Sequence, residues 1–178
     1  MINNKMLSWI FVAALFFSAC SDDSEDNTNA SYDGESFTLD KGFTASSGPK
    51  FTAGTHGIYI YLVSNLVSYD ATEDDFTGSG NVIKLDVFTA EENVLTAGTY
   101  SRTKDQPSED EFRLFGLDAK VFINYDEALQ MDDEERGERI IFGTVIVSKD
   151  GDNFTFDLDI TTETSTFIGT YTGSLLSI

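Results

Sequence analysis

The sequence has little of the chemistry from which most enzyme and metal sites are built. It contains one cysteine (Cys20), one histidine (His56) and one tryptophan (Trp9) in 178 residues. A single cysteine permits no internal disulfide, so stability has to come from the burial of apolar side chains. One histidine excludes multi-histidine metal chemistry and most zinc sites. The two prolines, Pro49 and Pro107, stand in polar surroundings that are typical of loops.

Positive charge is also scarce. Eleven lysines and arginines stand against 31 aspartates and glutamates, which gives a net charge of −20. Such a surface repels nucleic acid phosphates, so we expect no nucleic acid partner. It keeps a protein soluble, and we expect a monomer. Solubility is a simpler explanation of the acidity than a specific acidic function.

Catalytic motifs are absent from the sequence. There is no G-x-S-x-G, no Walker A motif and no G-x-G-x-x-G, so we assign no catalytic residue and no cofactor. We interpret His56 as an exposed turn histidine, since nothing near it in sequence would orient it as a base. The stretch Asp150–Asn153 is rich in oxygen ligands, but it lacks the twelve-residue spacing of an EF-hand. A hairpin turn explains the same residues, and we assign no metal site.

The N-terminus has the pattern of an export signal. A short basic segment, Met1–Lys5, precedes an uncharged, mostly apolar run over Met6–Phe17, and small residues then lead to Cys20. The run is shorter than the ~20 residues that a membrane-spanning helix needs, and it fits a secretory signal. We therefore predict a signal peptide over 1–19, a flexible acidic tether over 20–33 and a single β domain over 34–178.

Two short motifs make the predicted location of the protein more specific. Phe16–Cys20 resembles the lipobox of bacterial lipoproteins, with Phe17 at the position usually held by leucine. The resemblance implies lipidation of Cys20 and a membrane anchor through the N-terminal lipid. The acidic Ser21–Asp26 resembles the surface-export signal of lipoproteins of the Bacteroidota, which implies an outer-membrane protein facing the exterior. The alternative is a solvated spacer.

Beyond residue 33 the apolar period is two almost everywhere, which predicts an all-β domain of eight or nine strands. Periodicity does not separate an antiparallel two-sheet sandwich from a flattened lipocalin-like barrel. Asp70–Gly80 is predicted as a loop, and Asp126–Gly137 as one or two helical turns at most. The predicted strands are Glu35–Leu39, Gly57–Ser64, Asn81–Phe88, Leu95–Ser101, Phe112–Leu117, Lys120–Tyr125, Arg139–Ser148, 154–161 and Thr166–Leu175.

The last three strands have the clearest pattern. An Asp150-Gly151 turn predicts a hairpin, and Asp157 and Asp159 alternate with apolar residues, which predicts one wet face in an up-and-down meander. Gly169 and Gly173 predict bulges or strong curvature. With Gly143, Val145, Val147 and Gly169–Gly173, this block resembles the closing hairpins of uncharacterised small β-rich lipoproteins of the Bacteroidota. The resemblance implies a fold and a compartment, not an active site.

Tyrosines are the best candidates for a binding surface, because their rings can stack on sugars while the hydroxyl stays hydrated. We expect a non-catalytic β domain that binds a glycan, a small ligand or an outer-membrane protein partner. The alternatives are a carboxylate-based hydrolase acting on polysaccharide or peptidoglycan, and a structural or adhesive subunit. A packed interior would favour surface recognition over a buried ligand. The tyrosines considered are Tyr59, Tyr61, Tyr69, Tyr100, Tyr125 and Tyr171.

Overall fold

The computed structural model describes residues 28–49, 55–102, 114–115, 118–127 and 137–178. These residues form thirteen strands and no helix, so none of them belongs to a helix that could cross a membrane. The strands are β1 (Ala30–Tyr32), β2 (Glu35–Phe37), β3 (Lys41–Pro49), β4 (His56–Val63), β5 (Ser68–Asp70), β6 (Asp75–Thr77), β7 (Ser79–Thr89), β8 (Gly98–Arg102), β9 (Leu114–Phe115), β10 (Lys120–Asp126), β11 (Glu138–Asp150), β12 (Asn153–Thr162) and β13 (Thr166–Ser177).

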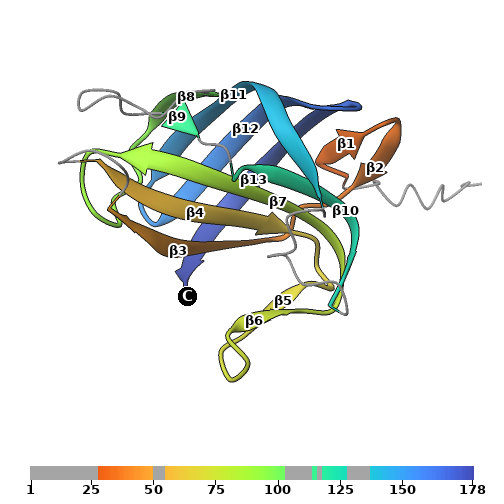
Figure 1. The fold of residues 1–178 in the computed structure, drawn as a ribbon, viewed down its shortest axis with the longest axis horizontal. Coiled ribbons are helices and arrows are strands. Elements are labelled where there is room, and N and C mark those ends of the chain that lie inside the picture. Colours follow the sequence, from red (N-terminus) through yellow and green to blue (C-terminus); the bar gives the residue numbers. More distant parts are fainter. Residues whose placement is uncertain (1–27, 50–54, 103–113, 116–117, 128–136) are drawn as a thin grey trace, which may run out of the picture.

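The strands form two layers around a common core. One layer is made of β3, β4 and β7 and the other of β11, β12 and β13, and the strands of the two layers cross at an angle (Figure 1). Antiparallel pairing links β7 through β10 to β11, and parallel pairing links β13 to β3. β8 and β9 connect β11 to β7 a second time. The pairings therefore close into a ring, while β5 and β6 form a separate two-stranded sheet.

The all-β prediction is confirmed, and both predicted architectures describe part of it. Two layers pack face to face as in a sandwich, but hydrogen-bonded pairings join their edges as in a flattened barrel. The predicted strand count was too low because β1, β3, β5 and β6 were missed. β1, β5 and β6 have only three residues each. β3 has nine, but its sequence KGFTASSGP is rich in glycine and small polar residues and shows no apolar alternation. Most pairings are antiparallel as predicted, with two exceptions: β13 pairs β3 and β8 pairs β9 in parallel.

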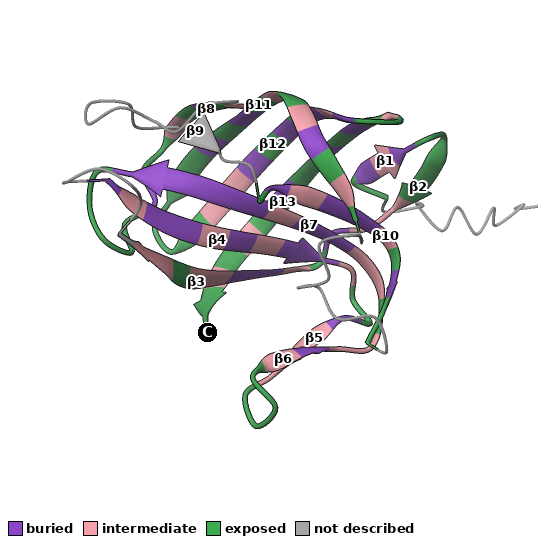
Figure 2. Ribbon diagram, viewed as in Figure 1, coloured by how far each residue is buried: buried purple, intermediate pink, exposed green. Residues whose placement is uncertain are grey.

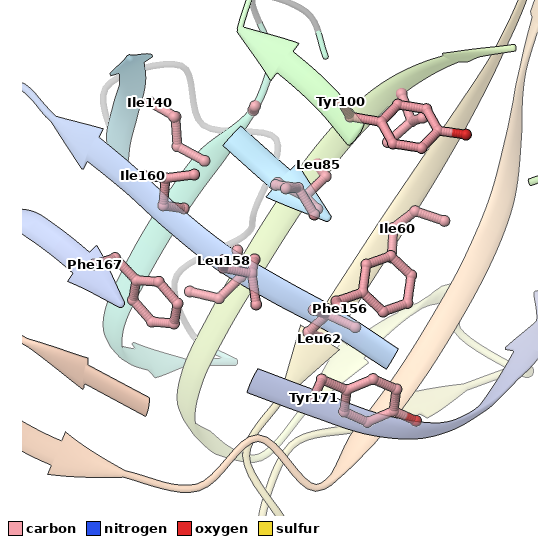
Figure 3. Packing of buried hydrophobic residues seen from close by; sticks show 14 of the residues in the cluster. Ile60, Leu62, Leu85, Tyr100, Ile140, Phe156, Leu158, Ile160, Phe167 and Tyr171 are labelled. Carbon is pink, nitrogen blue, oxygen red and sulfur yellow. The ribbon is translucent and has the colours of Figure 1, made fainter. Parts of the chain in front are cut away.

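Apolar side chains from both layers fill the space between them (Figure 3). Ile60 and Leu62 of β4 meet Phe156 and Leu158 of β12 in this cluster, and each is at most 2% exposed. Burying one such side chain stabilises the fold by about 1.5–3 kcal/mol. Because the interior is packed, recognition of a ligand is favoured on the outer surface of the domain.

The predicted C-terminal meander is confirmed. β11 pairs β12 and β12 pairs β13 along nearly their whole lengths, and Asp157 and Asp159 lie on the exposed side as predicted. The hairpin turn lies one residue further on than predicted. Asp150 pairs with Asn153, so the two central residues are Gly151 and Asp152. Only Gly151 has a positive φ (60°), the glycine-first pattern of a type II′ turn.

The glycines of β11 and β13 have different roles. No register shift occurs at Gly169 or Gly173, so the predicted bulges there were wrong. A Cβ at Gly169 would lie 2.9 Å from the Ala30 Cβ, and one at Gly173 would lie 2.6 Å from the Tyr171 hydroxyl. Both glycines therefore make room for neighbours. The bulge is instead in β11, just before Gly143, whose φ is 127°.

Three other predictions need correction or fall outside the described residues. The tether was predicted to reach residue 33, but Ala30 and Tyr32 are buried in β1, which pairs with β13. The domain therefore begins before residue 34. Asp70–Gly80 is not a simple loop, because it holds β6 and the end of β5. Cys20 and most of the helical turns predicted for Asp126–Gly137 lie outside the described residues.

Candidate functional site

The six candidate tyrosines divide into two groups. Tyr100, Tyr125 and Tyr171 are 1–3% exposed and belong to the packed clusters. Their environment raises the pKa of Tyr171 and brings that of Tyr125 to about 12, in both cases through burial first. Tyr59, Tyr61 and Tyr69 are instead half-buried at the surface. Only the second group is available to a ligand.

Strand alternation places Tyr59 and Tyr61 side by side on the outside of the domain. Ile58, Ile60 and Leu62 of β4 point into the core, so the two tyrosines between them point outward. Their ring centroids are 6.3 Å apart. Tyr61 lies directly opposite Lys84 of β7. The Nζ of Lys84 is 4.6 Å from the centroid of the Tyr59 ring. This spacing is that of a cation–π interaction.

The β5–β6 hairpin completes this surface. Phe76 of β6 is buried in a second apolar cluster, with Phe43, Val82 and Tyr125 among its members. Its ring centroid lies 4.8 Å from that of Tyr61 and 5.6 Å from that of Tyr69. The outer surface of β3, β4 and β7, together with Tyr69 and Phe76 of the hairpin, is named the tyrosine face below.

Polar contacts hold the base of the hairpin. Lys41 Nζ donates to the Val67 carbonyl oxygen at 3.0 Å and to Ser68 Oγ at 2.8 Å. The Tyr125 hydroxyl donates to the Phe76 carbonyl oxygen at 2.8 Å. The hairpin is therefore packed and hydrogen-bonded onto the layer, not merely attached at its ends.

A cavity of about 210 Å³ opens between the hairpin and the layer. It is smaller than the roughly 300–1,000 Å³ of sites for drug-sized ligands, so it suits one small ring. Rings form one part of its wall and carboxylates another, the combination that fits a molecule with an apolar face and hydroxyl groups at its rim. The lining residues are Ala45, Tyr61, Tyr69, Asp74, Asp75, Phe76 and Ile178. We call this space the hairpin cavity.

Carboxylates set the electrostatics at the rim of the hairpin cavity. Tyr69 donates its hydroxyl to Asp74 Oδ1, and this hydrogen bond raises the pKa of Tyr69. A hydrogen bond from the Thr72 backbone N–H lowers the pKa of Asp70 at the hairpin turn. The Tyr59 hydroxyl lies 3.4 Å from Asp118 Oδ2. Tyrosine hydroxyls and aspartate carboxylates therefore lie together at this surface, and the carboxylate oxygens accept hydrogen bonds.

Lys84 and Asp86 both lie on the outer side of β7, but they are covered to different extents. Asp86 lies opposite Tyr59 and is 3% exposed, while Lys84 is half-buried. The sequence pattern gave no sign of the hairpin, which brings Asp74, Asp75 and Phe76 to the same surface. A phenylalanine beside an acidic run was the only signal for it.

Other residues considered from the sequence lie apart from this surface. His56 is not in an exposed turn: it begins β4, is half-buried, and its Nδ1 is buried without a hydrogen-bond partner. Among the described residues, no group of three histidine, cysteine or acidic side chains is arranged to hold a metal ion. Asp157 and Asp159 lie on the other layer.

A second polar cluster, at the ends of β11 and β12, is hydrogen-bonded within itself. Glu138 Oε2 accepts from the Tyr32 hydroxyl at 2.5 Å and from Thr162 Oγ1 at 2.7 Å, and also from Thr164 Oγ1. Partial burial would raise the pKa of Glu138, but these donors outweigh it and the pKa is lowered. A general acid needs the opposite shift, so the cluster fits a structural role.

Comparison with protein-family models, with curated proteins and with solved structures finds no match to this chain.

Proposed function

We propose that this protein is a lipid-anchored surface protein whose β domain binds a glycan through the tyrosine face. One observation carries the proposal: Tyr61 and Tyr69 line the hairpin cavity at the surface, with Tyr59 beside Tyr61, while the other candidate tyrosines are buried. Aromatic rings supply an apolar platform, and hydroxyl and carboxylate oxygens beside them meet the hydroxyl groups of a sugar.

The charge at the rim of the hairpin cavity favours a hydroxyl-rich ligand over an apolar one. Asp74 and Asp75 line the cavity with Tyr61 and Tyr69. Ionised carboxylates accept hydrogen bonds and are costly to desolvate against an apolar surface. A sugar ring satisfies both groups of residues at once, since its hydroxyl groups donate to the carboxylates while its carbon face covers the rings.

The anchoring part of the proposal is based on the sequence. Cys20 stands where a lipobox would place the lipidated residue, ahead of the acidic Ser21–Asp26. The domain begins with β1, which pairs with β13 in the layer opposite the tyrosine face. A chain anchored ahead of β1 is therefore joined to the far layer, which leaves the tyrosine face accessible to a ligand.

Calorimetric titration against a panel of neutral and acidic oligosaccharides tests the binding proposal. We expect at least one glycan to bind, and Tyr61→Ala to weaken it tenfold or more, which corresponds to about 1.4 kcal/mol. Tyr69→Ala is a second variant that removes less packing. Ile146→Ala, on the other layer and 48% exposed, is the control and should bind as the wild type does. Turnover of a glycan, or binding that both tyrosine variants retain, would contradict the proposal.

The anchor is tested separately. Cys20→Ser should release the protein from the membrane fraction of a producing bacterium and remove its lipid mass. Protease treatment of intact cells then reports whether the wild-type domain faces the exterior. An anchored Cys20→Ser protein that kept its lipid mass would overturn the anchoring proposal and leave glycan binding untouched.

A further inference from the structure

Three of the few cations of this acidic chain lie in one line across neighbouring strands. Lys84 of β7 is the direct partner of Lys120 of β10, and Lys120 is the direct partner of Arg139 of β11. Each is next to a core residue on its strand: Ile83, Val121 and Ile140 are buried, so the three charged side chains all point outward. We call Lys84, Lys120 and Arg139 the basic row.

The basic row continues the tyrosine face. Tyr61 is opposite Lys84 on the next strand, so the order across the sheet is Tyr61, Lys84, Lys120 and Arg139. With neighbouring strands about 4.8 Å apart, the row reaches about 14 Å from Tyr61. Since Tyr61 lines the hairpin cavity, a ligand held there can extend over the row.

This placement needs an explanation, because like charges directly opposite each other destabilise a sheet. A chain with 31 acidic residues could place a carboxylate opposite a lysine at little cost. Here a lysine faces a lysine, and an arginine comes next. Arg139 is also close enough to Arg102 for its charge to contribute to the lowered pKa of that guanidinium, although burial of Arg102 has the larger effect. The charge of Asp86, on the same side of β7 as Lys84, acts on the pKa of Arg102 in the opposite sense. The row therefore places three cations on neighbouring strands of a protein that is negative as a whole.

We propose that the basic row binds the anionic groups of an acidic glycan whose neighbouring sugar occupies the hairpin cavity. This inference rests on the proposed function of the tyrosine face and specifies its ligand class: an oligosaccharide that carries carboxylates, as uronic acids do, or sulfate esters. Arginine and lysine pair with both groups. The acidic rim then meets only hydroxyl groups, and the anionic groups lie over the cations.

The experiment compares matched glycans that differ only in charge. Polygalacturonate is titrated against its methyl ester, and dextran sulfate against dextran, at about 50 mM and about 500 mM NaCl, conditions that differ severalfold in Debye length. We expect tighter binding of at least one anionic member and weaker binding at high salt. Preference for polygalacturonate would identify carboxylate as the recognised group, and preference for dextran sulfate would identify sulfate.

Charge-neutral variants assign the effect to the basic row. Lys84→Gln and Arg139→Gln should each weaken binding of the anionic glycan tenfold or more. Arg139 lies on β11, outside the tyrosine face, so Arg139→Gln should leave binding of a neutral glycan within twofold. Lys149→Gln is the matched control: it changes the net charge equally, and Lys149 lies over Phe154 on the β11–β12 hairpin. Equal binding of charged and neutral members, or equal losses in all three variants, would overturn this inference. If no glycan of either kind binds, the proposed function itself fails.

Discussion

The two outer faces of the domain both come from strands with alternating side chains, but they differ in how far their outward side chains are buried. On β11, β12 and β13 the outward side chains are mostly exposed, whereas on β4 and β7 they are half-buried or buried (Figure 2). The first surface carries Thr144, Asp157, Asp159, Thr170 and Thr172, and we call it the threonine face. The tyrosine face has a packed hairpin above it, and the threonine face is open to solvent.

The difference shows what a second apolar cluster does for a β domain. A strand with one wet face needs only period-two alternation, as β12 has. β4 and β7 carry apolar or aromatic residues on both sides, because the hairpin adds a small core outside the main one. The additional burial holds Tyr61 and Tyr69 at fixed positions beside the hairpin cavity. Rigid aromatic groups lose little conformational entropy on binding, so the tyrosine face is preorganised and the threonine face is not.

The sharpest test of this contrast uses two phenylalanines. Phe76 of the β5–β6 hairpin is 6% exposed, whereas Phe142 is 66% exposed on the outside of β11. Phe76→Ala should lower the free energy of unfolding by about 3–5 kcal/mol, the usual cost of removing a buried ring. Phe142→Ala should change it by no more than about 0.5 kcal/mol. Urea unfolding measures both, and similar losses in the two variants would erase the distinction between the faces.

A smaller effect is expected at the Glu138 cluster, away from both faces. Glu138→Gln should cost about 1–2 kcal/mol at neutral pH, because hydrogen bonds to a charged acceptor are replaced by weaker ones. The lowered pKa of Glu138 contributes stability above the unfolded-state value of about 4.3. This contribution disappears as pH falls through the lower folded-state pKa.

Unfolding of the wild type and of Glu138→Gln at about pH 7 and about pH 3 measures this effect. The two proteins should differ at the higher pH and converge at the lower one. Glycan binding at neutral pH should be the same in both, since the cluster is part of neither face. A difference that persists unchanged at low pH would show that the carboxylate charge is not what stabilises this cluster.

An effect of about 1 kcal/mol is expected where the hairpin meets β10. Tyr125→Phe removes the buried hydrogen bond to the Phe76 carbonyl oxygen. In the wild type the Tyr125 pKa is raised to about 12, so its stabilising effect is complete below the unfolded-state value of about 10 and is lost as pH rises towards 12. Thermal melts between pH 9 and about 12 should therefore show a shallower decline in Tyr125→Phe. Parallel declines would show that Tyr125 does not sense the alkaline transition.

Alternation alone was enough to predict β4, β7, β11, β12 and β13 and the wet side of β12, because period two reports which side of a strand is buried. It missed β3, in which Phe43 is the only large apolar residue. It did not predict which tyrosines reach the surface. Tyr125 follows a register shift in β10 after Phe122, and a shift of one residue reverses the face. Ile168 and Tyr171 are three residues apart on β13, so their side chains point to opposite sides of the sheet. The sequence pattern does not show that Tyr171 is the buried one and Ile168 the exposed one.

The hairpin and β1 were missed for a different reason. Three-residue strands are shorter than the window in which a period can be recognised, and they form because partners distant in sequence complete them. β1 pairs with β13 across the length of the domain, and β6 is fixed by Phe76 against β3 and β4. The basic row was hidden in the same way, since its members come from strands that only the register brings together.

The smallest expected effect is on the threonine face. Thr155 Oγ1 and Thr172 Oγ1 lie 3.1 Å apart on β12 and β13. This hydrogen bond is exposed, and water replaces it readily, so Thr155→Val should change the free energy of unfolding by less than about 0.5 kcal/mol. Glycan binding should not change. Urea unfolding and the titration described for the tyrosine face measure both quantities. A loss of binding in Thr155→Val would show that the open face is a second recognition surface, and the contrast between the two faces would then be one of ligand and not of construction.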